Sequence, residues 1–174
     1  AAATQVIEEQ DVRAVPIGRH PRFKPVAGQY DGAPVAGLPC GPTEAARFGV
    51  HLELFAAGRV IVVPAGIGVA DGQQDGAFVR GGRCRHALST TEPTGVVEVV
   101  HGTRATLGDL FALWGEPLTP RRIASFRGPV RAYVDGEVVE GDPAAIRLRH
   151  HTQIVLAIGP AVPVHSAFAF RAGL

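Results

Sequence analysis

The chain has 174 residues, a formal net charge of +1, 46% hydrophobic residues and 19% charged residues. This length fits one domain with a self-sufficient core, and the balanced charge gives no global field to attract nucleic acid. No run reaches the roughly 18 consecutive apolar residues of a transmembrane helix, so we expect no nucleic-acid partner and no membrane span in this chain.

The first 46 residues are rich in proline and glycine, and proline is excluded from helix interiors and central strands. We therefore predict an extended Pro/Gly-rich arm over residues 1–46, lying on the body or on a partner, and a single domain over residues 47–174. The chain starts with AAATQVIEEQ and contains no Met. We take this start as the end of a processed chain from which a signal or anchor was removed.

Two β segments and a loop are predicted next. Residues 51–63 form a strand, a turn at Ala57-Gly58 and a β-branched second strand. Residues 70–83 are polar and glycine-rich and are predicted to form a long loop, and loops of that length are often mobile or functional. A third strand is predicted in TGVVEVVHG, from Thr94.

The clearest helix follows Thr106, which is a good N-cap, with Asp109 placed to complete a capping box. Gly115 and Pro117 end the helix. Its apolar residues recur at helical spacing and predict a stripe that packs on the core: Leu107, Leu110, Phe111 and Trp114.

A second hairpin is predicted at Asp135-Gly136, a pair that favours tight hairpin turns. The unbroken apolar run 154–158 predicts a last, central strand, and a proline-containing tail follows it. The order hairpin, strand, helix, hairpin, strand predicts an α+β domain. We expect a small mixed or antiparallel sheet with one main helix packed on it, in a β-grasp-like arrangement.

Metal binding is the chemistry for which the chain offers candidates, because nucleophile, phosphate-loop and HExxH motifs are absent. His51 and Glu53 are two residues apart and share one face of a strand. His151 joins them only if the last strand lies near the first. Since a stable site takes three or four ligands, these three residues predict at most a weak copper- or zinc-binding module.

Cys40 and Cys84 are the only cysteines, and they have no CxxC spacing. In an exported protein they would pair, and closing a loop of this length would contribute about 4 kcal/mol in the chain-entropy model. In a cytosolic protein they would be two buried free thiols.

A family resemblance extends from about Leu38 to Leu174. It is carried, in this order, by LPC, HLELFAAGR, VPAGIGV, CRHALSTTEPTGVVEV, TLGDLFALWGEPL, YVDGEVVEGDPAAIRL, HTQIVLAIG and the closing GL. These segments resemble a family of uncharacterised exported or membrane-anchored bacterial proteins with a histidine-rich pattern. The resemblance implies that Cys40 and Cys84 form a disulfide, and that the family's histidine-rich surface suits a transition metal.

The histidine set does not carry over to this chain. His51 and His151 remain, whereas other family histidines fall at positions held here by different residues: Gly49, Ser89, Thr91 and Glu98. We therefore expect no cofactor. The leading hypothesis is a non-catalytic exported accessory or structural subunit.

Such a subunit would lie outside the cytoplasm, in the periplasm or at the cell surface. It would bind a protein partner or a larger assembly, membrane-associated assemblies included, and its arm and tail would supply contact surface. The alternatives are the weak metal module and an enzyme with unrecognised chemistry.

Overall fold

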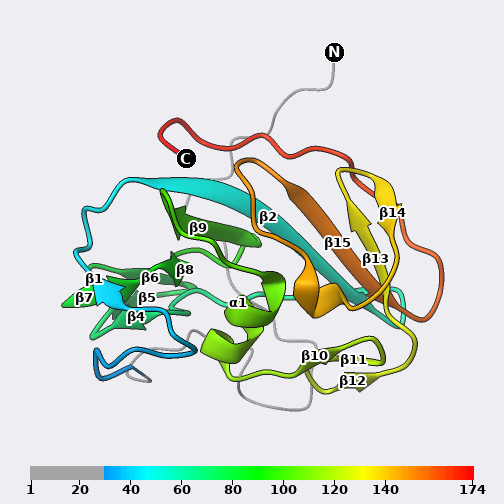
Figure 1. Cartoon of the computed structure of the whole chain (residues 1–174), viewed down its shortest axis with the longest axis horizontal. Helices are drawn as coiled ribbons and strands as arrows, with labels where there is room; N and C mark the ends of the chain where they lie inside the picture. Colours follow the sequence, from blue (N-terminus) through cyan, green and yellow to red (C-terminus); the bar gives the residue numbers. More distant parts are fainter. Residues whose placement is uncertain (1–29) are drawn as a thin grey trace.

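The computed structural model describes residues 30–174, so most of the predicted arm lies outside the described part and the division at residue 46 stays a prediction. The largest element is a seven-stranded sheet (Figure 1). Its order is β14 (Glu137–Val139), β13 (Arg131–Val134), β15 (Gln153–Ile158), β2 (Arg47–Ala56), β9 (Val96–Val100) and β8 (Leu88–Ser89), with β3 (Arg59–Ile61) also paired to β2.

Strands β2 and β15 form the middle of this sheet. They run parallel, with His51 opposite Gln153, whereas all other neighbouring strands in the sheet are antiparallel. The first half of β2 pairs with β9 and its last three residues pair with β3. All six residues of β15 are buried, so the unbroken apolar run is an interior strand, as predicted.

Three smaller sheets flank the large one. They are the sheet of β1 (Cys40–Gly41), β7 (Cys84–His86) and β4 (Val69–Ala70), the hairpin of β5 (Gln73–Asp75) and β6 (Phe78–Arg80), and the meander of β10 (Leu118–Thr119), β11 (Arg122–Ile123) and β12 (Phe126–Arg127). Residues 70–83, predicted to be a loop, therefore carry a hairpin instead.

The predicted helix is confirmed as α1 (Leu107–Trp114), and a one-turn 3-10 helix, η3 (Pro143–Ala145), packs near it. The Thr106 hydroxyl accepts a hydrogen bond from the backbone N–H of Asp109, and the Asp109 carboxylate accepts one from the Thr106 N–H, at 3.3 and 2.8 Å. No helix within residues 30–174 is both long and apolar enough to cross a bilayer.

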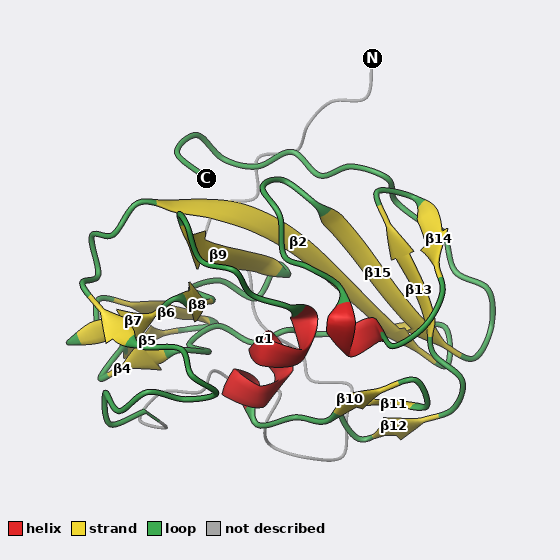
Figure 2. Cartoon of the chain, viewed as in Figure 1, coloured by secondary structure: helices red, strands yellow, loops and turns green. Residues whose placement is uncertain are grey.

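The predicted α+β, β-grasp-like class is wrong. In the described part of the chain fifteen strands accompany the single α-helix (Figure 2), so the fold is mostly β. Many of these strands have only two or three residues, too few to show the alternation by which a strand is recognised in a sequence. The helix, by contrast, has its own cap and stripe.

The core lies on one side of the large sheet, beneath β2. Val50, Leu52 and Leu54 of β2 pack in one cluster with Leu110 and Trp114 of α1. The C-terminal segment runs along the opposite side of the sheet from α1 (Figure 1). The sheet is therefore a middle layer with two differently covered faces.

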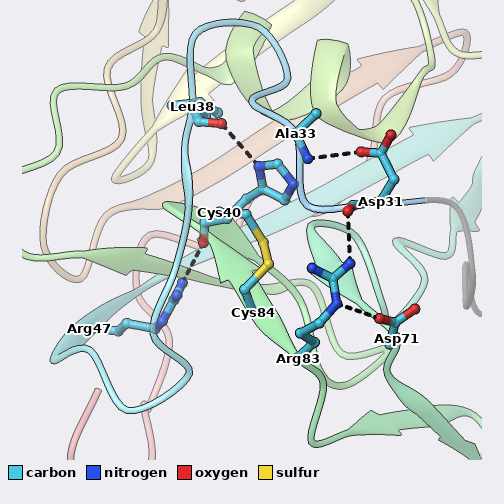
Figure 3. Close-up of a disulfide and its surroundings, with 9 residues drawn as sticks. Asp31, Ala33, Leu38, Cys40, Arg47, Asp71, Arg83 and Cys84 are labelled. Atoms are coloured by element: carbon cyan, nitrogen blue, oxygen red, sulfur yellow. Dashed lines mark hydrogen bonds and ion pairs between the residues drawn. A yellow bond between two sulfur atoms is a disulfide. The ribbon is translucent and has the colours of Figure 1, made fainter.

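Cys40 and Cys84 form a disulfide that joins β1 to β7 (Figure 3), and neither cysteine is free. Arg83 adds a second tie, because its side chain donates to the carbonyl of Asp31 at 2.7 Å and to the carboxylate of Asp71 at 2.8 Å. The disulfide fits an oxidising, extracytoplasmic environment.

Candidate functional site

One face of the large sheet, here called the outer face, carries polar residues. Successive side chains of a strand point to opposite faces, so Gly49, His51 and Glu53 of β2 face away from the core that Val50, Leu52 and Leu54 enter. Glu98 of β9 lies opposite Gly49 in the ladder and continues this face.

Residues 160–174, here called the strap, lie along the outer face. Within the strap the ring of Phe168 stacks on His51, with centroids 3.7 Å apart and planes 11° from parallel. The ring of Phe170 stacks on His151 at 4.4 Å and 6°. The two phenylalanine rings also meet edge to face at 5.0 Å, and such aromatic pairs add to the burial of their surface.

Gly49 allows this close approach. A Cβ built at position 49 would lie 2.4 Å from a ring carbon of Phe170 and 3.4 Å from Cβ of Leu174. The missing side chain of β2 therefore makes the space that the strap fills.

His51 is held by hydrogen bonds at both ring nitrogens. Nε2 lies 2.8 Å from the carbonyl oxygen of Thr94, which can only accept, so Nε2 carries a proton. Nδ1 lies 2.7 Å from the side-chain oxygen Oε1 of Gln153. Phe168 covers one face of the ring, so binding a metal at His51 would require these contacts to break.

The other two predicted metal ligands also have partners. The condition set for His151 is met, because β15 pairs directly with β2. Glu53, however, accepts from His165 of the strap at 2.9 Å, and His151 Nε2 lies 2.6 Å from the carbonyl oxygen of Leu174. Within residues 30–174 no group of three or more His, Cys, Asp or Glu side chains is placed to hold a metal ion.

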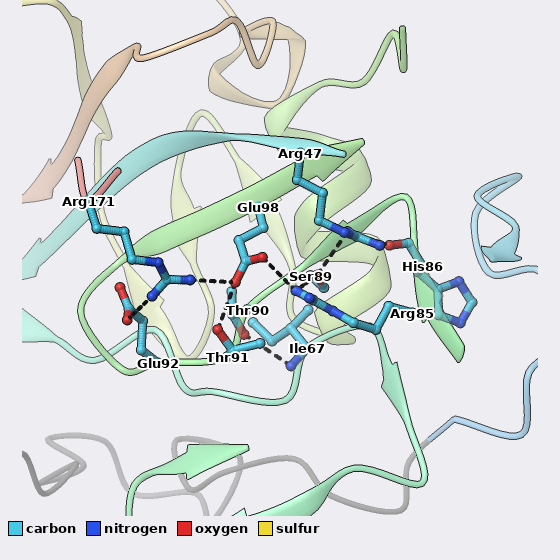
Figure 4. A network of polar contacts seen from close by, with 10 residues as sticks. All are labelled: Arg47, Ile67, Arg85, His86, Ser89, Thr90, Thr91, Glu92, Glu98 and Arg171. Atoms are coloured by element: carbon cyan, nitrogen blue, oxygen red, sulfur yellow. Dashed lines mark hydrogen bonds and ion pairs between the residues drawn. The ribbon is translucent and has the colours of Figure 1, made fainter. Parts of the chain in front are cut away.

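Glu98 is the centre of a buried polar network at the end of the strap (Figure 4). One carboxylate oxygen accepts from Arg85 at 2.8 Å, and the other accepts from Thr91 at 2.7 Å. Arg171 of the strap reaches the same carboxylate at 3.4 Å and that of Glu92 at 2.7 Å. Arg171, near the end of the strap, thus places its guanidinium group between two carboxylates.

The Glu98 carboxyl stays ionised in this setting. Burial raises its pKa, but the charge of Arg85, the hydrogen bonds from Thr91 and Arg85 and the charge of Arg171 lower it by more. The pKa of Glu98 therefore lies below its ordinary value.

A second buried cation adjoins the network. Arg47 donates to the Ser89 hydroxyl at 3.0 Å, Arg85 donates to the same oxygen at 2.7 Å, and Arg47 also donates to the carbonyl of His86 at 3.0 Å. Burial and the neighbouring charge of Arg85 lower the pKa of Arg47 to about 10. Positive charge is thus held close to Glu98 at a cost in solvation.

The network borders an open pocket of about 370 Å³, here called the charged pocket. Arginine side chains, glutamate carboxylates and apolar side chains all line this pocket. Its lining comes from the β5–β6 hairpin, from β7 and β9, from the turn before β9 and from the strap: Phe78, Val79, Arg80, Gly81, Arg85, Thr91, Glu92, Glu98 and Arg171.

In the sequence, Glu98 was named only as a position at which the resembling family has a histidine, and Arg85 and Arg171 were not named. One signal was present for Glu98, which is a lone acid within the run VVEVV and so had to be either exposed or paired. Arg85 and Arg171 carried no comparable signal, because their partners are distant in sequence.

The four positions at which histidines of the resembling family are replaced in this chain lie close together in the structure. Gly49, Glu98 and Ser89 are successive neighbours across β2, β9 and β8, and Thr91 bonds to Glu98. A scan against known protein families, a search of curated proteins and a search of solved structures found no match for this chain. The resemblance therefore stays a prediction.

Proposed function

We propose that this chain is a non-catalytic, extracytoplasmic accessory subunit that attaches to a protein partner or larger assembly through the outer face and the charged pocket. The observation that carries the proposal is the placement of the Arg85–Glu98 ion pair, whose side chains are largely buried, in the lining of an open pocket. Buried charges held by fixed partners give an interface its register and its selectivity.

The state of Glu98 supports binding over catalysis. A general acid or base needs a pKa near the working pH and access to a substrate proton. The pKa of Glu98 is lowered instead, and its oxygens are occupied by Arg85, Thr91 and Arg171. The carboxylate is suited to holding cations in place.

The disulfide supports an extracytoplasmic location for the protein. Cys40 and Cys84 are bonded, which is typical of periplasmic and secreted proteins. We include in this proposal the exported or membrane-anchored family that the sequence resembles, with its histidine set replaced here around Gly49 and Glu98.

The test is co-purification of the full chain from the cell envelope of its source, followed by native mass spectrometry. We expect a stoichiometric protein component with the wild type, an at least tenfold loss of that component with Glu92→Arg, which reverses a charge in the pocket lining, and no loss with Arg149→Glu, an exposed control. A wild-type chain recovered alone as a monomer contradicts the proposal.

A titration with zinc and copper separates the alternative metal module. The proposal predicts no tight stoichiometric binding by the wild type. Stoichiometric binding that His51→Ala abolishes would overturn the proposal in favour of a metal carrier.

A further inference from the structure

Resting on the proposed function, we infer that the outer face is a binding groove for one kind of partner segment. That segment is extended, carries two aromatic residues two positions apart and has a basic residue directly after the second. In the isolated chain the groove is filled by the strap, whose Phe168, Phe170 and Arg171 show the chemistry that the groove selects.

The two positions of the groove that receive aromatic rings are spaced like alternate residues of an extended chain. Phe168 and Phe170 are half-buried while residues 167, 169 and 171 are exposed, which is the alternation of an extended segment. The positions beneath the two rings, His51 and Gly49, are likewise two residues apart in β2. Both repeats are therefore roughly 6.6 Å, so one ring falls on each position.

The end of the groove selects a cation. Arg171 is the only basic group that the strap brings to Glu92 and Glu98, whose side chains are only 16% and 6% exposed. Glu98 keeps its ion pair with Arg85 at 2.8 Å when the strap leaves, whereas Glu92 has no other ion-pair partner among residues 30–174. A carboxylate as buried as that of Glu92 is unfavourable without a cationic partner. A replacing segment therefore needs a basic side chain at the position of Arg171.

The strap is built to be replaceable. Among the described residues it forms no strand, and its contacts with the outer face are made mainly by side chains. Its two ionic anchors, His165 and Arg171, are 59% and 49% exposed, and exposed ion pairs contribute little to stability. Pro160 and Pro163 keep the connection from β15 extended and stop it from pairing as a strand.

The experiment uses the full chain and a synthetic peptide with the sequence of residues 161–174, measured by isothermal titration calorimetry. Arg171→Glu in the chain places like charge beside Glu92 and releases the strap. We expect this variant to bind the peptide at least tenfold more tightly than the wild type does, because the wild-type groove is already filled. Phe170→Ala is a second strap-releasing variant, and near-UV circular dichroism checks that each variant is folded.

Two controls test the selectivity. The same peptide carrying Arg171→Glu, or Phe168→Ala with Phe170→Ala, should bind the released chain at least tenfold more weakly. Adding Glu92→Gln to the released chain should weaken binding of the unaltered peptide. Weaker binding in all of these measurements is needed to assign the two aromatic positions and the basic position of the partner segment.

Binding no stronger than that of a scrambled peptide to either folded, released variant overturns the inference. A concentration-dependent dimer of the wild-type chain in sedimentation also overturns it, in favour of strap exchange between two copies. Neither result bears on envelope co-purification, so a failure of the groove is distinguishable from a failure of the proposed function.

Discussion

Phe170 lies directly over Gly49, so closely that a Cβ at position 49 would come within 2.4 Å of its ring. One missing side chain in the central strand thus decides where the C-terminal end of the chain packs. The strap, the two stacked histidines and the buried charges around Glu98 all depend on that contact or adjoin it.

Gly49→Ala is expected to detach the strap without unfolding the body. The new methyl group overlaps the ring of Phe170, which must move, whereas the core side chains of β2 point the other way. Hydrogen exchange and limited proteolysis should show faster exchange and cleavage within residues 160–174.

Two matched variants accompany this measurement. Gly41→Ala has open space around its added Cβ and should leave the strap protected. Phe170→Ala removes the ring on the other side of the same contact and should expose the strap to a similar degree. Unchanged protection in Gly49→Ala alone would contradict the packing described for the outer face.

Glu98→Gln is expected to destabilise the protein by about 3 kcal/mol at neutral pH, because it leaves the buried Arg85 without its carboxylate. The wild type should also lose stability in acid. The folded pKa of Glu98 lies below the ordinary 4.5, so its contribution is complete above that pH and disappears as pH falls through the folded value.

Urea denaturation from pH 7 to pH 3 measures both effects. The Glu98→Gln variant should show a flatter decline below pH 4.5 than the wild type, while the exposed control Glu140→Gln should follow the wild type. Parallel curves for the wild type and Glu98→Gln would show that Glu98 does not carry the acid dependence.

Because Tyr30 is buried, we expect the free energy of unfolding to fall in alkali. Burial raises its pKa to about 12 from 10.0, and its hydroxyl donates to the carbonyl of Leu113 at 2.8 Å. A raised folded pKa means that stability is intact below pH 10 and is lost as pH rises toward the folded value of about 12. Tyr30→Phe should cost about 1 kcal/mol at neutral pH by removing that hydrogen bond.

Absorbance near the tyrosinate band, followed with Tyr30→Phe and Tyr133→Phe, assigns the titration. The transition near pH 12 should vanish in Tyr30→Phe and persist in Tyr133→Phe. A single transition near 10 in the Tyr133→Phe variant would mean that Tyr30 is not buried in solution.

Reduction of the disulfide should destabilise the body by about 4 kcal/mol in the chain-entropy model, since it closes a loop with a sequence separation of 44. The double variant Cys40→Ser/Cys84→Ser should have the same stability with and without reductant, and the wild type should fall to its level on reduction. A wild type that is insensitive to full reduction would rule out a structural role for this bond.

Local features were predictable because their causes are local. Thr106 and Asp109 are three residues apart and cap α1 themselves. Asp135-Gly136 turns the β13–β14 hairpin, and the apolar run of β15 needs burial on both faces wherever it lies. Each of these signals is complete within a few residues, so the sequence alone was sufficient.

The sequence by itself determined the capped helix, the two hairpin turns at 57–58 and 135–136 and the interior last strand. Only the tertiary structure decided the mostly β class and the site. Strands of two residues are too short to show an alternating pattern in the sequence, and they form because neighbouring strands pair with them. Glu98 and Arg171, which meet at the site, are 73 residues apart in the sequence. Contacts between residues so distant in sequence depend on which chain segments the sheet brings together, and the local periodicity of the sequence does not predict them.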